Sequence, residues 1–287
     1  MFNGVTVTDD LLHRCAADGR GLTWVTRNGR FLARVNGPTN GNPRLRLAQA
    51  RTHQDPVSCL NLAKAMVAGK LHNYRQLTLR SARDLTGSRQ ASLRGVAEQH
   101  ANALASLRDA ATLDEVRGIE GRAARDYFQA LPAFAPAVKP GRSKRPPTDP
   151  FNCLLSFGYG MLRAAVHGAL EQVGLDPYIG YLHGIRPAKP DLALDLMEEF
   201  RPLLVDRLVL TLVNRGQIKS SHTETLPDGT VQLTEPGRKF FLEQWSLAPE
   251  RSWLTSTSAA KSLPQHCLWF KHVCWRGICV ATPTVIP

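Results

Sequence analysis

The acidic and imidazole side chains between His183 and Glu198 have the types and spacing that best suit catalysis. Asp195 and Glu198 are three residues apart, so a helix would carry both carboxylates on one face. That helix is largely apolar, and carboxylates facing an apolar interior are costly unless they are paired or bound to a metal ion. One histidine with carboxylates suits a hard divalent ion, Mg²⁺ or Mn²⁺. The alternative is a hydrogen-bonded core histidine, because His183 follows the apolar and aromatic run Tyr178–Leu182.

Glu120 is a further candidate, because it lies between Gly118 and Gly121 inside a predicted helix. Each glycine costs a helix interior about 1 kcal/mol relative to alanine. A glycine beside a carboxylate could let backbone or a ligand approach closely. The alternative is a solvated glutamate on an exposed helix face.

Two long helices are predicted around these candidates. Thr112-Leu113-Asp114-Glu115 is a capping box, which predicts a helix that carries Glu120 and ends near Pro132. Asp149-Pro150 supplies an N-cap and a first-turn proline. Apolar residues at three- and four-residue steps then predict a helix that ends at Gly174.

The segment that follows is predicted to hold shorter elements. Asp176-Pro177 predicts the start of a short helix, and Asp191 the start of the next, which Pro202 kinks or divides. Pro227-Asp228-Gly229 predicts a turn between two extended stretches.

The N-terminal segment differs from the rest because it reads as strands with one helix. Asp9 and Asp10 predict the start of a helix. Asn28-Gly29 lies between the strand-like runs Leu22–Thr26 and Arg30–Val35, which is a strong signal for a β-hairpin. A lone hairpin is marginally stable in water, so we expect it to belong to a larger sheet.

The composition favours a polyanionic partner. The chain has 287 residues, a formal net charge of +12 and a pI near 9.8, which points to nucleic acid first and an anionic membrane second. The excess is localised: Arg27–Arg51 holds six arginines and Ala137–Pro147 holds four cations, and neither segment contains an acid. With 43% apolar residues the chain is not a mostly disordered one.

The sequence also bears on the compartment. There is no run of 18 apolar residues, so no membrane-spanning helix is expected, and the first residues do not have the pattern of a secretory signal. The six cysteines form no C-x-x-C pair, and the histidines and cysteines near the C-terminus do not have zinc-site spacing. We therefore expect a cytoplasmic protein with reduced thiols.

Several motifs in order resemble one known family. The segment Asn152–Ile218, which contains GLDPYIGYLHG and DLALDLMEEF, resembles the CRISPR adaptation integrase, the first-numbered CRISPR-associated protein. GIEGRAARDYF (Gly118–Phe128) and GRSKRPPTDP (Gly141–Pro150) match that family's pattern in the right order, and Gly21–Pro38 resembles the end of its N-terminal β-domain. The resemblance covers about Val5–Gln244.

The resemblance implies a fold, an activity and a set of ligands. The family has an N-terminal β-sandwich and a C-terminal α-helical domain with a metal site. Its members form homodimers, join a small ferredoxin-like partner (the second-numbered CRISPR-associated protein), and insert captured double-stranded DNA into a CRISPR array. The ligands carried over are Glu120, His183 and Glu198, with Asp195 beside them, for Mg²⁺ or Mn²⁺. Arg142, Lys144 and Arg145 are candidates for contacts to DNA phosphates; the alternative is a solvated basic loop.

The expected architecture is therefore α+β. Residues 1–43 would form a partial N-terminal β-domain, residues 44–244 a helical catalytic domain, and residues 245–287 a poorly ordered tail. Compared with the family pattern, the chain is expected to begin inside the sandwich. The tail holds four of the five tryptophans and only one acidic residue, resembles translation in a shifted reading frame, and is expected to lack stable helix.

Three functions are compatible with these observations. The first is a metal-dependent DNA endonuclease and integrase. The second is an inactive truncated remnant that binds DNA or a protein partner without catalysis. A helical RNA-binding protein without a metal site is the third, and the ordered motifs disfavour it. Separately, we expect the expressed chain to be poorly soluble and weakly active.

Overall fold

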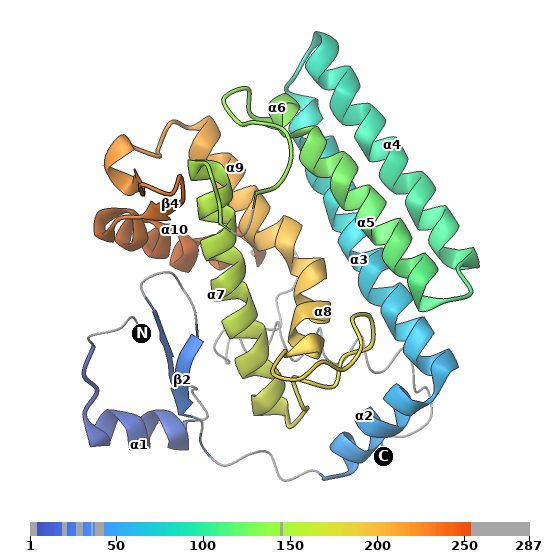
Figure 1. Cartoon of the computed structure of the whole chain (residues 1–287), viewed down its shortest axis with the longest axis vertical. Helices are drawn as coiled ribbons and strands as arrows, with labels where there is room; N and C mark the ends of the chain where they lie inside the picture. The colour runs from blue at the N-terminus through green and yellow to red at the C-terminus, as the bar shows by residue number, and fades with distance from the viewer. Residues whose placement is uncertain are drawn as a thin grey trace. The chain divides into compact units, whose positions relative to one another are not determined.

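The structure is a computed structural model that describes residues 5–18, 22–26, 31–35, 37, 43–143 and 146–253. This part of the chain is mostly helical, with two small two-stranded antiparallel sheets (Figure 1). The prediction of an α+β protein with a large helical part is therefore confirmed at the level of element types. No helix among these residues is both long enough and apolar enough to cross a membrane.

The chain folds into two compact units, each assembled from separated segments. Unit 1 contains the described residues of Met1–Leu62 together with Gly160–Met197. Unit 2 contains those of Ala63–Tyr159 together with residues 198–253. The predicted domain boundaries after residues 43 and 244 stay predictions.

Unit 1 begins with a capped helix and the predicted hairpin. Helix α1 (Asp9–Ala17) is capped by Thr8, whose Oγ1 accepts a hydrogen bond from the Leu11 amide, while Asp9 and Asp10 lie in its first turn. Strands β1 (Leu22–Val25) and β2 (Phe31–Val35) pair antiparallel, which confirms the hairpin; its turn, residues 27–30, lies outside the described residues. Within the described chain, no further strand joins this sheet.

The hairpin is attached to helix α7 (Pro150–Val173) by one buried arginine. Arg34 of β2 forms an ion pair with Glu171 and donates to the Ala164 carbonyl at 3.3 Å. Helix α2 (Pro43–Gln54) follows the hairpin.

Unit 2 contains a layer of long helices. Helix α3 (Pro56–Arg83) enters it from unit 1 at Ala63 and is followed by α4 (Gly87–Asp109), α5 (Leu113–Gln129) and the short α6 (Leu131–Phe134). The predicted helix start at Thr112 is confirmed, because the Thr112 Oγ1 accepts a hydrogen bond from the Glu115 amide. The Glu115 carboxylate accepts from the Ala111 amide, one residue before the N-cap, and not from the Thr112 amide of a capping box. Tyr74 of α3 packs against Tyr127 of α5 with ring centroids 4.1 Å apart, which joins these helices through an aromatic core.

Helix α7 begins as predicted, but the segment after it differs. The Asp149 carboxylate accepts a hydrogen bond from the Asn152 amide at 2.8 Å, as an N-cap does. The short helix predicted at Asp176-Pro177 is wrong: Asp176 accepts from the Tyr178 amide in a tight turn. The Pro177 carbonyl accepts from the Leu192 amide at 3.0 Å, so this loop caps the next helix instead.

Helix α8 (Asp191–Phe200) passes into a π-helical segment, Arg201–Asp206, and then into α9 (Arg207–Asn214). Pro202 lies at the start of the π-helical segment and has no amide hydrogen to donate, which is the predicted interruption. Gly158 of α7 lets this segment approach: a Cβ there would lie 2.6 Å from Val205.

The last described elements are a small hairpin and a helix. Strands β3 (Thr223–Thr225) and β4 (Val231–Leu233) flank the predicted turn and confirm it. Helix α10 (Glu235–Trp253) shows that the prediction of no stable helix from Trp245 onward is wrong for residues 245–253. Trp245 stacks on Phe241, which is buried, at a centroid distance of 6.4 Å, so the apolar face of α10 continues past the expected break. Residues 254–287, the rest of the predicted tail, lie outside the described residues.

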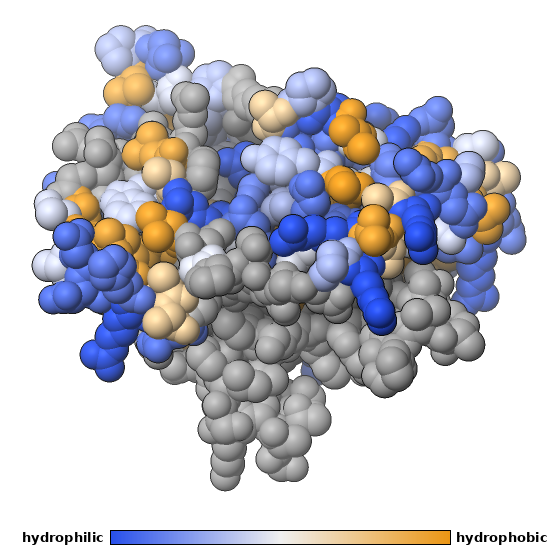
Figure 2. All heavy atoms as spheres, turned by 90° about the horizontal axis from the view of Figure 1, so that it is seen from below, coloured by the Kyte–Doolittle hydropathy of each residue, from blue (hydrophilic) through white to orange (hydrophobic). Residues whose placement is uncertain are grey.

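The described surface is polar with dispersed apolar residues. Figure 2 shows hydrophobic side chains on one face as small groups among hydrophilic ones. The larger exposed apolar side chains come from many elements: Val5, Leu11, Leu32, Val35, Leu47, Val57, Tyr178, Ile185 and Leu247. Isolated exposed apolar residues of this kind are normal for a folded protein.

Candidate active site

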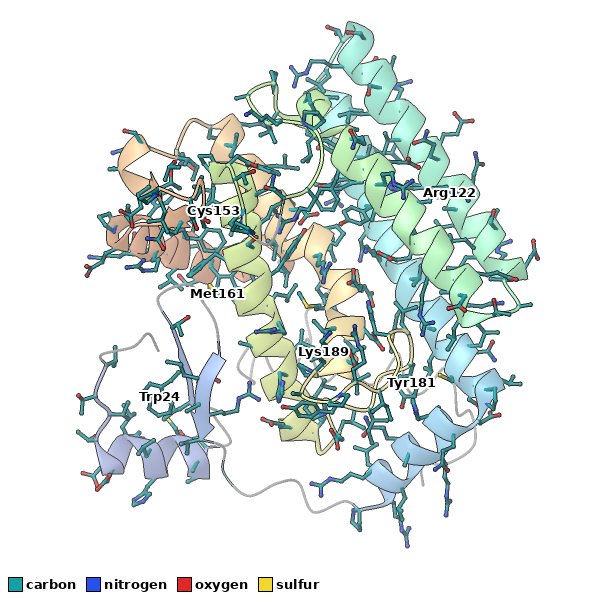
Figure 3. All side chains as sticks on the ribbon, viewed as in Figure 1. Trp24, Arg122, Cys153, Met161, Tyr181 and Lys189 are labelled. Carbon is teal, nitrogen blue, oxygen red and sulfur yellow. The ribbon has the colours of Figure 1, made fainter. Side chains whose placement is uncertain are left out.

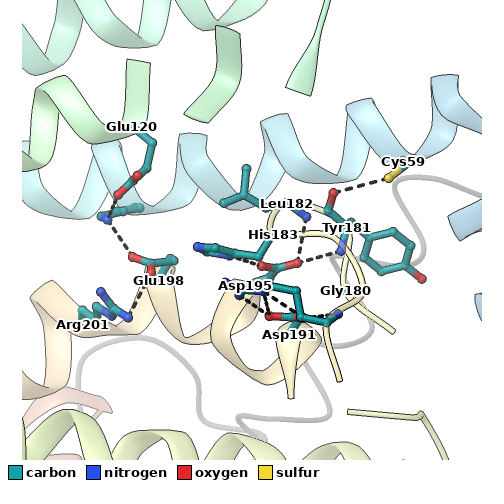
Figure 4. A network of polar contacts seen from close by, with 12 residues as sticks. Cys59, Glu120, Gly180, Tyr181, Leu182, His183, Asp191, Asp195, Glu198 and Arg201 are labelled. Atoms are coloured by element: carbon teal, nitrogen blue, oxygen red, sulfur yellow. Dashed lines mark hydrogen bonds and ion pairs between the residues drawn. The ribbon is translucent and has the colours of Figure 1, made fainter. Parts of the chain in front are cut away.

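Two polar networks contain the candidate residues, and each lies within one unit. The acid–lysine cluster of unit 2 comprises Lys70, Glu120, Glu198 and Arg201. The histidine network of unit 1 comprises His183, Asp195 and the backbone amides of Tyr181 and Leu182. Figure 4 shows the hydrogen bonds and ion pairs of both.

Lys70 reaches the cluster because it lies on the buried stripe of α3. The residues of this stripe recur at three- and four-residue steps: Ala63, Met66, Val67, Lys70, Leu71 and Tyr74 are all buried. A lysine on such a stripe must direct its ammonium group to buried acceptors, because an unpaired buried charge is very costly.

Two glutamates from different helices accept hydrogen bonds from the Lys70 ammonium group. Glu120 of α5 and Glu198 of α8 both pair with the Lys70 Nζ, and the Glu198 Oε2 lies 2.6 Å from it. The Lys70 side chain is 2% exposed and that of Glu198 5%, whereas Glu120 is 22% exposed. The other oxygen of Glu198 accepts from Arg201 at 3.0 Å. Two formal positive charges therefore balance two negative ones in a largely buried place.

The pKa of Lys70 reflects this balance. Burial by itself lowers the pKa of an ammonium group, but the Glu198 and Glu120 carboxylates outweigh burial and raise the pKa of Lys70 above its ordinary value. Lys70 is therefore a protonated cation at neutral pH.

A third acid, Asp206, lies next to the cluster in the π-helical segment. Its carboxylate accepts a hydrogen bond from the Tyr159 hydroxyl, and the Arg201 guanidinium lies 4.9 Å from the Tyr159 ring centroid. Burial raises the pKa of Asp206 to about 6, although Tyr159 and Arg201 act against this shift. Arg201 thus connects Glu198 to the Tyr159–Asp206 pair.

The histidine network fixes the orientation of one imidazole ring. The Asp195 carboxylate is fully buried; one oxygen bonds the His183 Nδ1, and the other accepts from the Tyr181 and Leu182 amides at 2.7 and 2.8 Å. A metal ion could be bound by His183 only through Nε2, because Asp195 occupies Nδ1. This carboxylate–histidine arrangement is typical of metal-binding histidines, with the carboxylate setting the tautomer of the ring.

The loop that carries His183 is held from two sides. Tyr181 and Lys189 lie in this loop between α7 and α8 (Figure 3). Gln49 of α2 donates to the Asp176 carbonyl at 2.8 Å and accepts from its amide at 2.9 Å. On the other side Gly180 lies against α8, where a Cβ would come within 2.8 Å of the Asp191 Cβ and 2.9 Å of the Asp195 Oδ2.

The structure thus brings together some of the predicted site residues. Glu120 and Glu198 share one cation, which makes the exposed, solvated alternative wrong for Glu120. Asp195 and Glu198 are both paired, as the cost of buried carboxylates requires, but with different partners. His183 bonds Asp195 in unit 1, and its approach to Glu120 and Glu198 stays a prediction.

The structure rules out one of the two reasons considered for the glycines beside Glu120, the close approach of backbone. A Cβ at Gly118 or Gly121 would have no neighbouring atom within 4 Å, so neither glycine is needed for close packing within the chain. The other possibility, the approach of a ligand, stays a prediction.

The predicted phosphate-binding residues are only partly described. Arg142 donates to the Asn152 Oδ1 at 2.7 Å and to the Ser156 Oγ at 3.0 Å, so its guanidinium anchors the basic loop to α7. Burial lowers the pKa of Arg142. Lys144 and Arg145 lie outside the described residues.

The donor set of the acid–lysine cluster fits a hard cation. Two carboxylates from different helices already converge on one positive charge, and carboxylate oxygens are the ligands that Mg²⁺ and Mn²⁺ prefer. Among the described residues, no group of three or more His, Cys, Asp and Glu side chains is arranged to hold a metal ion.

Sequence reasoning missed Lys70, Arg201 and the role of Asp206. One signal was available for Lys70, because a single lysine interrupts an apolar helix stripe between Val67 and Leu71. A local signal was also available for Arg201, because it follows Glu198 by three residues, the spacing of an ion pair on one helix face. Its contact with Tyr159 of α7 depends on the tertiary structure.

The described part of the chain thus belongs to the class of mostly helical proteins in which acids on separate helices meet around one buried cationic side chain. The family model for CRISPR associated protein Cas1 matches residues 1–246, so the chain belongs to the Cas1 family. The resemblance of the ordered motifs to the CRISPR adaptation integrase is therefore confirmed.

Relatives and solved structures agree with this assignment. The chain is 43% identical over 244 residues to CRISPR-associated endonuclease Cas1 1 of Moorella thermoacetica, covering 83% of this chain and 71% of that protein. It is 41% identical over 261 residues to CRISPR-associated endonuclease Cas1 2 of Rhodospirillum rubrum, covering 85% of this chain and 73% of that protein.

Two solved structures are similar in fold. A casposase bound to integration product matches with a TM-score of 0.80 at 21% identity, covering 98% of this chain and 77% of that chain. A Cas6-RT-Cas1–Cas2 complex matches with a TM-score of 0.77 at 24% identity, covering 98% of this chain and 30% of that chain. At these identities the likeness concerns the fold.

Proposed function

We propose that this protein is a metal-dependent DNA endonuclease and integrase that inserts new DNA segments into a CRISPR array. The observation that carries this proposal is the convergence of Glu120 and Glu198 on one cation. Both residues belong to the motifs that resemble the integrase family. The names of the relatives, which describe endonucleases, support the same activity.

The proposed site contains Glu120, His183 and Glu198 as ligands of Mg²⁺ or Mn²⁺. When bound, such an ion would supply Lewis-acid polarisation of the scissile phosphodiester. Asp195 holds the His183 ring through Nδ1, so Nε2 is the nitrogen that would bind such an ion. Arg201 offsets part of the negative charge of Glu198 and fixes one of its oxygens.

The reaction is a transesterification. The 3′-hydroxyl of the incoming DNA attacks a phosphorus atom of the array, a new phosphodiester bond forms, and the bond to the former 3′-oxygen breaks and leaves a 3′-hydroxyl. Water in place of the attacking hydroxyl gives strand cleavage. The basic side chains of the chain would bind the phosphates of both DNA segments.

We also propose that the protein works as a homodimer with Cas2 on double-stranded DNA. The support for the Cas2 partner is the solved Cas6-RT-Cas1–Cas2 complex, because this chain shares the fold of part of one of its chains. Measurement of the molecular mass in solution, with and without Cas2 and a DNA duplex, tests the assembly. A protein that stays monomeric and binds neither Cas2 nor the duplex would contradict it.

Strand transfer by the purified full chain tests the catalytic proposal. With Mn²⁺ and a labelled duplex bearing free 3′-hydroxyls, wild type should join it to a target, and Glu120→Gln, His183→Ala and Glu198→Gln should each abolish joining and cleavage. Glu98→Gln on the exposed surface of α4 is the matched control and should retain activity. DNA binding without metal-dependent cleavage in wild type would support the non-catalytic alternative instead.

A further inference from the structure

Lys70 occupies the position between Glu120 and Glu198 that a cation of a metal site would need. Its ammonium group is buried, bonded to one oxygen of each glutamate, and carried by a helix whose other stripe residues are apolar. A buried lysine at such a position destabilises the folded state unless its charge is compensated by the two carboxylates.

The two glutamates do require a cation to stay together. Glu198 is almost fully buried; Arg201 pairs with its Oε1, and Lys70 pairs with its Oε2 and also with Glu120. Without the ammonium group, two carboxylates in a poorly solvated place would repel each other and move apart.

We propose that Lys70 is a positioning residue that holds Glu120 and Glu198 at cation-binding spacing in the metal-free protein, and that a divalent ion displaces its ammonium group. This inference rests on the proposed function, because it takes both glutamates as metal ligands. Lys70 then pre-forms the site and weakens metal binding at the same time.

Displacement follows from the geometry of the shared oxygens. An ammonium group and a divalent ion compete for the same facing oxygens, since their like charges repel at such a short separation. The lysine side chain has a flexible stem, and the Tyr74 ring centroid lies 5.7 Å from Nζ, which offers the displaced group an aromatic face. Coupling between two binding events is reciprocal. The ion pairs of Lys70 with the two glutamates therefore lower the affinity for the metal ion by the same factor by which the bound metal ion weakens those ion pairs.

Replacing Lys70 by an uncharged side chain of similar length separates its two effects, which are to stabilise the metal-free site and to weaken metal binding. Lys70→Met should bind Mn²⁺ about tenfold or more tightly than wild type in calorimetric titration of the full chain. In EDTA its melting temperature should fall below that of wild type, and saturating Mn²⁺ should raise it by more than it raises wild type. Lys70→Arg keeps the charge and should retain weak, wild-type-like Mn²⁺ binding.

Lys64→Met is the matched control on the same helix. Lys64 donates to the Arg108 carbonyl at an exposed position, away from any carboxylate partner in the described residues. Its Mn²⁺ affinity and its Mn²⁺-induced change in melting temperature should equal those of wild type.

The outcomes distinguish this inference from the proposed function. Unchanged or weaker Mn²⁺ binding by Lys70→Met, with binding lost in Glu120→Gln and Glu198→Gln, would overturn the role of Lys70 and leave the metal site intact. Mn²⁺ binding that survives both glutamate variants would overturn the metal site and this inference together. If Lys70→Met is unfolded in EDTA, Mn²⁺ should restore its helical circular dichroism, and failure to restore it would also overturn the inference.

Discussion

At the scale of single residues, Asp195 and Glu198 show how similar acids can take different roles on one helix. They lie three residues apart on α8, yet Asp195 binds an imidazole and two backbone amides, whereas Glu198 binds two cationic side chains. Asp195 therefore acts through His183, and Glu198 is the better candidate for direct contact with a metal ion.

We predict that Asp195→Asn weakens Mn²⁺ binding by roughly 10–100-fold, because the amide no longer fixes the tautomer and the orientation of His183. Titration calorimetry measures this change. Asp114→Asn, at a side chain that is 90% exposed, is the control and should bind as wild type does. Equal affinities for the two variants would show that Asp195 only stabilises the loop.

A second prediction at this scale concerns pH. Folding raises the pKa of Asp206 from 3.8 to about 6, so the folded state favours the protonated carboxyl. The stability that this provides is present below pH 4 and is lost as pH rises through about 6.

Relative to Asp206→Asn, wild type should therefore lose up to about 3 kcal/mol of unfolding free energy between these pH values. Urea unfolding of both proteins over that pH range measures the difference. Stability profiles that stay parallel would contradict the raised pKa.

At the scale of elements, the fold of the site depends on close approach of a loop to a helix. Gly180 lies directly against the start of α8, and Pro177 caps that helix through its carbonyl. The loop from α7 to α8 is thus a packed part of the histidine network, although the sequence around Asp176-Pro177 predicted a helix.

We predict that Gly180→Ala destabilises the protein by about 1–3 kcal/mol, because the new methyl group would overlap with Asp191 and Asp195. Thermal unfolding measures the loss. Gly118→Ala is the control within a helix, where nothing lies near the added group, and should gain up to about 1 kcal/mol. A tolerated Gly180→Ala would mean that the loop does not lie against α8.

At the scale of the whole molecule, the charge available to DNA is smaller than the sequence suggests. Arg34 and Arg142 belong to the two acid-free basic clusters, yet Arg34 pairs with Glu171 and Arg142 bonds side chains of α7. Part of the basic excess therefore stabilises the fold.

We predict that DNA binding still depends steeply on salt and weakly on sequence, because the net charge is +12. The logarithm of the affinity should fall by about one unit per tenfold rise in salt for each neutralised phosphate. Fluorescence anisotropy with two unrelated duplexes measures both dependences. Affinity unchanged between low and physiological salt would contradict a phosphate-dominated interface.

The sequence by itself determined the local features of this protein. The N-caps at Thr112 and Asp149 and the interruption at Pro202 depend on residues only a few positions apart, and all three appear in the structure. The hairpin around Asn28-Gly29 and the family membership were predictable for the same reason, because turns and motifs are local patterns.

Only the tertiary structure decided which charges meet. Lys70, Glu120 and Glu198 are separated by long stretches of chain, and no spacing rule joins them. Whether a buried carboxylate is paired with a lysine, an arginine or a histidine depends on which helices pack together, and the free energy of that packing is summed over the whole core. The sequence shows that Asp195 and Glu198 of α8 need polar or charged partners. It does not show that Lys70 and His183 are among those partners.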